Sequence, residues 1–204
     1  YVVQYAVSGK QVPIVTSGVH FRWFGQVIEL KQVLTLKFSH DKDADYSGWS
    51  VPYKVRFNDA VEADISASIR VRLPVEPSTL LTLALDYRSQ DNLVNASLMP
   101  AIKEAIRNSA RMISAQDYIV GKGGIFEQAV IDQLQNGIYE LEVKTYRDTS
   151  RTQFQTADQR TINSDNQIKT EVIKIYGKDG LPIRKKNDFI KYGIEIAQVV
   201  VDNV

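Results

Sequence analysis

Apolar and polar residues alternate along much of the first third of the chain, a period of two that predicts β-strands. The clearest strand covers residues 61–73, where apolar residues at every second position are expected to share one buried face. These residues are Val61, Ala63, Ile65, Ala67, Ile69, Val71 and Leu73. A second strand is predicted over residues 27–38, and shorter runs of β-forming residues precede residue 16. The first third is therefore predicted to be β-rich.

Between Pro77 and Asn136 the apolar residues recur at steps of three and four, which is the period of amphipathic helices. The clearest helix is predicted from about residue 93 to residue 113, with Pro100 near its start or at a kink. Glycines at 121, 123 and 124 are expected to interrupt the helices. A further helix over residues 125–134 is expected to end at Asn136-Gly137.

From Ile138 onwards the pattern returns to β-strands. Strands are predicted over residues 139–145, 168–176 and 194–201, and Gly177-Lys178-Asp179-Gly180 predicts a hairpin turn with a return strand over 181–186. The polar residues 147–167 are expected to form a loop or an exposed hairpin. The succession of strands, helices and strands predicts an α+β fold.

Composition limits the kinds of partner and site that the chain is expected to have. The 25 basic and 24 acidic residues nearly balance, so no basic excess favours nucleic acid, and no nucleic-acid partner is expected. The absence of cysteine excludes disulfides and thiolate metal sites. No apolar run reaches the ~18–20 residues that cross a bilayer. Because the chain starts at Tyr1 and not at Met, we interpret it as a processed piece of a longer protein, so the lack of a membrane span here says nothing about an anchor in that protein.

The motifs that could carry chemistry are incomplete. His20 and His40 stand alone, without a second histidine at metal-ligand spacing. Residues 120–124 resemble a phosphate loop but lack its first glycine and its final Ser or Thr. The acidic residues 41–45 depart from a calcium loop at its sixth and twelfth positions. No catalytic, metal or cofactor site is therefore predicted, and the chain is interpreted as a protein without enzyme activity.

Two groups of side chains are candidate contact sites instead. Phe21, Trp23 and Phe24 follow the Gly18 turn, and they suit either core packing or an aromatic wedge at a membrane interface. Lys103, Arg107 and Arg111 share one helix face at four-residue spacing. They suit either the ordinary solvated side of a helix or a contact with a neighbouring subunit or anionic lipid.

The order of several short motifs resembles the SPFH family, also called band 7 or prohibitin-homology domains. Ser17-Gly18-Val19-His20-Phe21 is similar to the "P-G-x-H-F" turn of the family, with serine in place of proline. Residues 57–73 resemble its paired strands, residues 101–107 resemble its "l-x-x-a-i-R" helix, and residues 192–201 resemble its closing strand. Residues 138–191 depart from the pattern, and we interpret them as an inserted hairpin with a polar arm, as in a divergent member.

The resemblance implies a first β-rich SPFH subdomain over residues 1–75 and a second α/β subdomain over residues 76–204. It implies a membrane-associated scaffold without enzyme activity or cofactor, whose copies assemble with one another or with a paralogue into rings or cages. Such assemblies organise membrane patches and restrain partners such as membrane proteases. The lipid contact would be made partly by an anchor outside this sequence.

Two alternatives stay open. The first is a soluble shell or capsid-like assembly protein, in which the polar arm at residues 147–167 locks neighbouring copies together. The second is an enzyme whose site is built from scattered carboxylates. An anchor upstream of Tyr1 would favour the membrane scaffold, and a tightly bound metal or cofactor would favour the enzyme.

Overall fold

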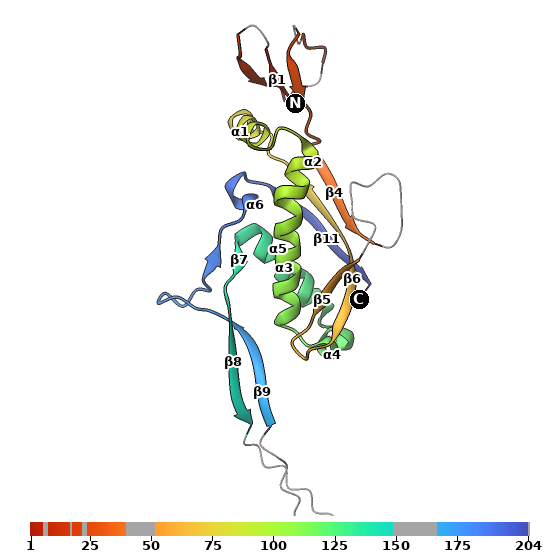
Figure 1. The fold of residues 1–204 in the computed structure, drawn as a ribbon, viewed down its shortest axis with the longest axis vertical. Coiled ribbons are helices and arrows are strands. Elements are labelled where there is room, and N and C mark those ends of the chain that lie inside the picture. Colours follow the sequence, from red (N-terminus) through yellow and green to blue (C-terminus); the bar gives the residue numbers. More distant parts are fainter. Residues whose placement is uncertain (6–7, 17, 22–23, 40–51, 149–166, 204) are drawn as a thin grey trace, which may run out of the picture.

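The computed structural model describes residues 1–5, 8–16, 18–21, 24–39, 52–148 and 167–203. These residues form an elongated molecule with three parts along its length (Figure 1). A small β-sheet lies at one end, a body of helices packed on a larger sheet lies in the middle, and a two-stranded hairpin projects from the other end. The mixture of antiparallel sheets and helices confirms the predicted α+β class.

The larger sheet pairs early strands of the chain with its last strand. Its strands run in the order β11-β6-β4, all antiparallel, and β5 pairs with the first half of β6. Their bounds are β4 (Val33–Phe38), β5 (Tyr53–Arg56), β6 (Glu62–Arg72) and β11 (Glu195–Asn203). The final segment of the chain therefore lies beside a strand from its first third.

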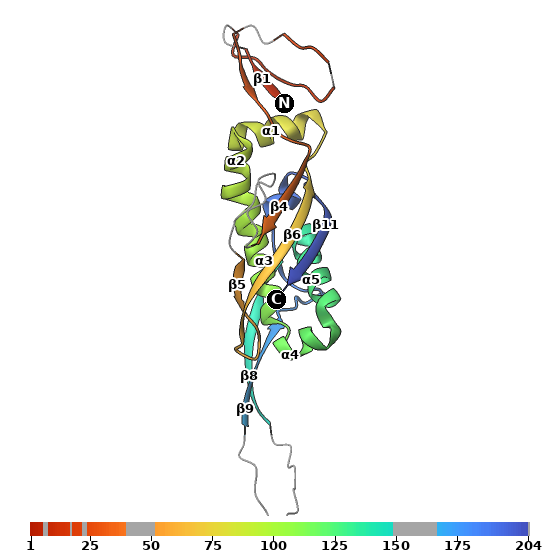
Figure 2. The same cartoon turned by 90° about the vertical axis from the view of Figure 1, so that its right-hand side faces the viewer.

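The alternation in β6 gives the sheet one buried face, as the sequence predicts for most positions. Ile65, Ala67, Ile69 and Val71 are at most 1% exposed, whereas the residues between them are exposed or half-buried. Val61 is a correction, because it is 47% exposed and precedes the start of the strand at Glu62. Figure 2 looks onto the outer face of this sheet, with the helices behind it.

The predicted long helix exists, but it contains a π-helical turn. It runs through α2 (Gln90–Leu93), η1 (Val94–Leu98) and α3 (Met99–Arg111). Pro100 is the second residue of α3, two positions after the π-helical turn ends at Leu98. Proline has no N–H to donate and its ring clashes with the carbonyl four residues earlier, so a wider turn just before it accommodates the ring without ending the helix.

The second predicted helix is α5 (Gly123–Asn136), which packs beside α3. The chain enters it through α4 (Ala115–Asp117) and η2 (Tyr118–Lys122), and Gly121 breaks the helical path with a φ of 127°. Ser114 caps α4, since its hydroxyl accepts a hydrogen bond of 3.0 Å from the Asp117 amide. Gly123 and Gly124, which were expected to interrupt the helix, instead form its first turn.

One hydrophobic core joins residues from both sides of the expected boundary at residues 75 and 76. Side chains of β4 and β6 pack against those of α3, α5 and β11 in this core. The largest fully buried residues in it are Phe38, Phe126, Phe189, Leu34, Leu36, Ile65 and Ile69. The boundary falls between β6 and α1 (Pro77–Tyr87), which begins with proline in its first turn as predicted.

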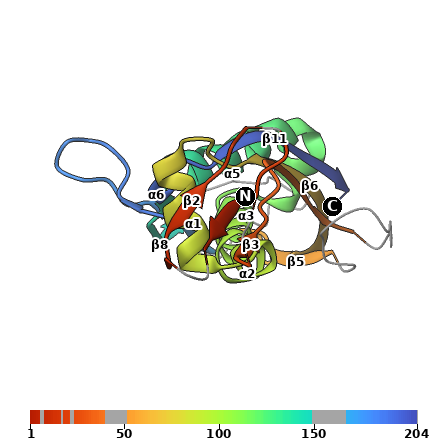
Figure 3. The ribbon, with the colours of Figure 1, turned by 90° about the horizontal axis from the view of Figure 1, so that it is seen from above.

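The small sheet at the end of the molecule has the order β2-β1-β3, with β1 (Val2–Gln4), β2 (Gln11–Pro13) and β3 (Gln26–Ile28). It lies over α1 (Figure 3), where Val2, Leu80 and Ala84 form a separate apolar cluster. The single strand predicted over residues 27–38 is wrong. The chain leaves one sheet after Ile28 and joins the other at Val33, because its hydrogen-bonding partner changes from β1 to β6.

The inserted region forms two antiparallel pairs of strands, which adjoin where β7 leads into β8. β7 (Ile138–Tyr139) pairs with β10 (Arg184–Lys185), and β8 (Leu141–Asp148) pairs with β9 (Gln167–Lys174). The turn at residues 177–180 forms as predicted, closed by a bond of 2.8 Å from the Gly177 amide to the Leu181 carbonyl. The return strand is shorter than predicted and pairs with β7. A short helix, α6 (Asp188–Lys191), then leads into β11.

Candidate membrane and partner contact sites

The predicted aromatic cluster lies in the connection between β2 and β3, within the small sheet at one end of the molecule (Figure 1). Val19, Phe21 and Phe24 form what we call the aromatic tip, and they are 93%, 77% and 93% exposed. Of the two interpretations, core packing is therefore wrong for Phe21 and Phe24. Trp23 lies outside the described residues.

The base of the aromatic tip is ordered by local contacts. The His20 ring stacks edge-on against Tyr1 at 5.8 Å between centroids, and its Nε2 lies 3.3 Å from the Thr16 carbonyl oxygen. Gly18 has a φ of 141° and Phe24 a φ of 57°, so the connection turns sharply at both positions. The histidine thus has a structural contact within the turn. His40 lies outside the described residues.

An apolar hollow of about 280 Å³ lies below the aromatic tip, where the small sheet meets the body. Its walls come from Tyr1, from the segments that follow β2, β3 and β6, and from α1, and they include Val15, Val75 and Leu80. Val15 and Val75 are about half exposed. The apolar surface at this end of the molecule therefore extends beyond the three residues of the tip.

The predicted row of cations on α3 consists of Lys103, Arg107 and Arg111, and it lies in the middle of the molecule. Tyr53 of β5 engages two of them. The Arg107 guanidinium donates a bond of 2.7 Å to the Tyr53 hydroxyl, and the Lys103 ammonium lies 5.7 Å from the centre of the Tyr53 ring. The row and the aromatic tip are not brought together, and the row helps to attach α3 to the sheet.

A polar cluster that sequence reasoning missed joins α6 to α1 and η1. The Asp188 carboxylate accepts hydrogen bonds of 2.8 Å from the Tyr87 hydroxyl and 2.7 Å from the Ser97 hydroxyl. Beside it, Tyr192 donates to Asp86, and the Lys191 ammonium lies 2.6 Å from the Tyr192 hydroxyl. Partners about a hundred positions apart leave no periodic signal in the sequence, although Tyr192 belongs to the recognised closing motif.

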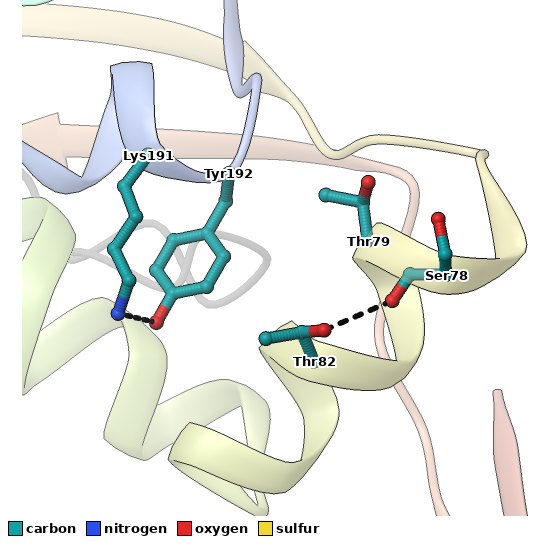
Figure 4. Close-up of a pocket in the computed structure, with 5 residues that line it drawn as sticks. All are labelled: Ser78, Thr79, Thr82, Lys191 and Tyr192. Atoms are coloured by element: carbon teal, nitrogen blue, oxygen red, sulfur yellow. Dashed lines mark hydrogen bonds between the residues drawn. The ribbon is translucent and has the colours of Figure 1, made fainter.

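This cluster forms one wall of a shallow pocket of about 200 Å³ (Figure 4). Hydroxyl groups of α1 form the other wall, from Ser78, Thr79 and Thr82. The Glu76 carboxylate already accepts bonds of 3.0 Å from the Ser78 and Thr79 hydroxyls, and the Thr82 hydroxyl donates to the Ser78 carbonyl. The polar groups of the pocket are thus largely engaged with one another.

The protonation states in this cluster suit a structural link. Burial raises the pKa of Tyr87 to about 12, with a smaller contribution from the hydrogen bond to Asp188 and against a lowering by the Ser97 hydroxyl. Burial and the Asp86 carboxylate also raise the pKa of Tyr192, and the hydrogen bond to Tyr192 raises the pKa of Lys191. These groups hold their protons at neutral pH, so they act as hydrogen-bond donors and are poor candidates for a general base.

A second polar cluster fixes the base of the projecting hairpin. The Tyr139 hydroxyl bonds to Asp132 of α5, and the Arg184 guanidinium lies 3.0 Å from the same carboxylate. The Arg184 and Lys174 cations lie 4.6 and 3.8 Å from the centre of the Tyr139 ring. The Tyr139 hydroxyl is thus fixed by a carboxylate and its ring by two cations. These contacts orient β8 where it leaves the body.

Within the described residues, no group of three or more His, Cys, Asp or Glu side chains is arranged to hold a metal ion. The acidic residues 41–45 lie outside those residues. The described helices also include none that is long and apolar enough to span a bilayer. The aromatic tip belongs to the small sheet at one end of the molecule, and the hairpin projects from the other end (Figure 1).

Comparison with models of protein families matches the whole chain, residues 1–204, to the SPFH domain / Band 7 family. No curated protein and no solved structure matches it. The match agrees with the order of motifs along the chain and with the mixed antiparallel sheets and helices of the fold. The chain belongs to the SPFH domain / Band 7 family.

Proposed function

We propose that this chain is a membrane-contacting scaffold module, whose aromatic tip enters the interfacial region of a lipid bilayer while neighbouring copies assemble beside it. Membership of the SPFH domain / Band 7 family supports a membrane-associated, scaffold-type role. The observation that carries the proposal is the exposure of Phe21 and Phe24, at 77% and 93%, in the β2–β3 connection of the small sheet that forms one end of the elongated molecule.

The energetics favour lipid as the partner of the tip. Burying one phenylalanine side chain contributes about 1.5–3 kcal/mol. Two exposed phenylalanines in one connection would therefore favour binding to an apolar partner substantially. Val15 and Val19 add apolar surface on the same connection. Aromatic side chains also favour the interfacial region of a bilayer, where a turn can enter without burying its backbone deeply.

The scaffold role would depend on where the module sits relative to the bilayer and on how many copies assemble. A module that contacts lipid at one end holds its body at a fixed distance from the bilayer. Assembled copies would then present a repeated surface to partners such as a membrane protease. This role requires no reaction at the protein itself. The cation row on α3 would serve the module by attaching helix to sheet at Tyr53.

The proposal is tested by co-flotation of the chain with phosphatidylcholine vesicles. We expect Phe21→Ser with Phe24→Ser to lower the partition coefficient at least about tenfold, since two interfacial rings are lost. The matched control is Leu181→Ser, which removes a side chain that is 64% exposed at the turn after residue 177. The control should float like the unchanged chain.

Two outcomes would contradict the proposal. If the double variant floats as well as the unchanged chain, the aromatic tip is not the lipid contact. If neither binds vesicles at any lipid concentration, while the chain still forms large assemblies, the shell or capsid-like alternative becomes the better function.

A further inference from the structure

The projecting hairpin consists of β8 and β9 and stands clear of the body (Figures 1 and 2). From here on we call these two strands the arm; most of the polar segment predicted over residues 147–167, namely residues 149–166, lies outside the described residues. None of its described side chains over residues 141–146 and 170–174 is buried, and Val143 is 62% exposed. A hairpin of two strands is marginally stable in water by itself. An arm of this kind gains stability when a further strand covers one of its edges.

Both edges of the arm are available for pairing. Within the described residues β8 and β9 form a sheet of two strands only, so each strand has one edge without a neighbour. The Ile175 amide bonds across to the Glu140 carbonyl at 3.0 Å, which fixes the alternation of the ladder above it. Val143 and Val172 lie opposite each other, and this alternation turns their backbone N–H groups outward, one to each edge.

The sequence of the arm matches a second copy of itself. Within the hairpin Lys144 lies opposite Glu171, Val143 opposite Val172, and Thr145 opposite Thr170. If β8 of one copy pairs with β9 of the next in the same register, every one of these pairings is repeated across the new junction. Each Lys144 then lies between two Glu171 carboxylates, and each valine lies beside a valine on both sides.

This match overcomes the usual protection of a sheet edge. A lysine on an edge strand discourages strand addition, because the incoming strand must accept its charge. In the repeated register the incoming strand brings Glu171 opposite Lys144, so the charge is compensated. A foreign strand without a glutamate at this position meets an unpaired lysine instead. The arm therefore discriminates in favour of its own sequence.

We propose that neighbouring copies of this chain associate by strand addition, with β8 of one arm pairing with β9 of the next. The contact is head-to-tail, so it generates closed rings or open filaments rather than isolated dimers. It deepens the proposed scaffold function by naming the surface that links copies, and it rests on that function only in requiring more than one copy.

The test uses proline at the two outward-facing positions. Val143→Pro removes a donor from the β8 edge, and Val172→Pro removes one from the β9 edge, while the inner ladder keeps its hydrogen bonds. Mass is followed by light scattering as concentration rises. We expect the unchanged chain to form multimers, and each proline variant alone to remain near 23.0 kDa.

Complementation makes the test specific. Each variant retains the edge that the other lacks, so an equimolar mixture of the two should form species of twice the monomer mass and nothing larger. Val143→Thr and Val172→Thr are the matched controls, because they keep the N–H groups and should assemble like the unchanged chain. Far-UV circular dichroism and urea unfolding of all four variants establish that the body still folds.

Three results would overturn the inference. The first is an unchanged chain that stays at 23.0 kDa up to its solubility limit. The second is normal assembly of Val172→Pro, which indicates that β8 pairs with β8. The third is a mixture of proline variants that does not associate. Flotation of Val143→Pro on phosphatidylcholine vesicles separates this outcome from the scaffold proposal, because a monomer that still binds lipid leaves the tip intact.

Discussion

At the scale of single residues, Tyr139 carries a measurable electrostatic signature. Burial, followed by the hydrogen bond and the charge of Asp132, raises its pKa from 10.0 to about 12. Burial alone would raise the pKa of Asp132, but hydrogen bonds from Tyr139, Asn136 and Arg184 together lower it below 3.8. The phenol thus stays neutral and the carboxylate stays charged across the neutral range.

The signs give a prediction for stability at high pH. The folded protein holds the Tyr139 proton up to about pH 12, whereas the unfolded chain releases it near pH 10.0. The contribution is therefore complete below pH 10.0 and is lost as the pH rises towards 12. We expect the free energy of unfolding in urea to fall over this range, and Tyr139→Phe to make the fall shallower. Tyr87, raised to about 12 in the same way, accounts for part of the remainder.

Tyr176→Phe is the control for the loss of a tyrosine hydroxyl at an exposed position, because Tyr176 is 60% exposed. An identical slope in Tyr139→Phe and the unchanged chain would count against the burial of this phenol. On the acid side the sign is opposite. Asp132 stabilises the folded protein above pH 3.8, and this contribution is lost as the pH falls through its lowered pKa.

The burial of a single side chain can be predicted where apolar residues recur at a regular spacing. It cannot be predicted where it depends on partners far away in sequence. The buried positions from Ile65 to Val71 follow from alternation alone. Gln133 is fully buried, yet its sequence position predicts only a helix. Its amide donates bonds of 3.1 Å to the Ala105 carbonyl and 2.8 Å to the Ser109 hydroxyl, and these partners become neighbours only when α3 and α5 pack.

At the scale of elements, the end of α5 depends on one glycine. Gly137 has a φ of 107°, a backbone conformation that residues with a side chain rarely adopt. A Cβ atom there would also lie 3.0 Å from the Lys185 carbonyl and 3.2 Å from the Arg184 Cβ atom, because β10 approaches closely. The turn and the close approach of β10 therefore require the same residue.

We predict that Gly137→Ala lowers the free energy of unfolding by about 1–3 kcal/mol, through the strained backbone and the displacement of β10. Gly124→Ala provides the matched comparison within the same helix. A Cβ at Gly124 meets no atom within 4 Å, so this variant should raise the free energy of unfolding by about 0.5–1 kcal/mol. Urea titration of both measures the two effects, and equal values for the two variants would contradict the argument.

The sequence predicts most elements but not how strands are distributed between sheets. Residues 27–38 read as one strand because apolar residues continue through them. The division after Ile28 reflects hydrogen-bonding partners, since the Gln32 carbonyl accepts from the Leu73 amide, and the Lys31 amide donates to the Gln90 side chain. Such partners lie far away in sequence, so local periodicity cannot predict them.

At the scale of the whole molecule, the two candidate contact surfaces belong to opposite ends, with the main core between them (Figure 1). Residue type alone leaves the aromatic cluster open between core packing and a membrane wedge, and the exposure of Phe21 and Phe24 needed the fold. The arm was predicted as an inserted hairpin, but its register, which makes its edges complementary, needed the pairing of β8 with β9. The sequence thus indicated where both segments lie along the chain, whereas their exposure and strand register needed the three-dimensional structure.

This arrangement predicts three levels of backbone protection in hydrogen exchange. Amides of β6 should exchange slowest, because β4, β5 and β11 pair with it and the main core covers it. Amides of β1 should be intermediate, since the small sheet rests on the limited cluster around Val2 and Leu80. Amides of the arm should exchange fastest in dilute solution.

Because the two ends contact different partners, they should also respond separately. Raising the protein concentration should slow exchange in β8 and β9 and leave the tip unchanged, since strand addition gives the outward N–H groups of the arm new acceptors. Adding phosphatidylcholine vesicles to the Val143→Pro monomer should slow exchange between Phe24 and Ile28 and leave the arm unchanged. Protection that rises at both ends under either condition would show that one contact induces the other, and would contradict two independent surfaces on a single core.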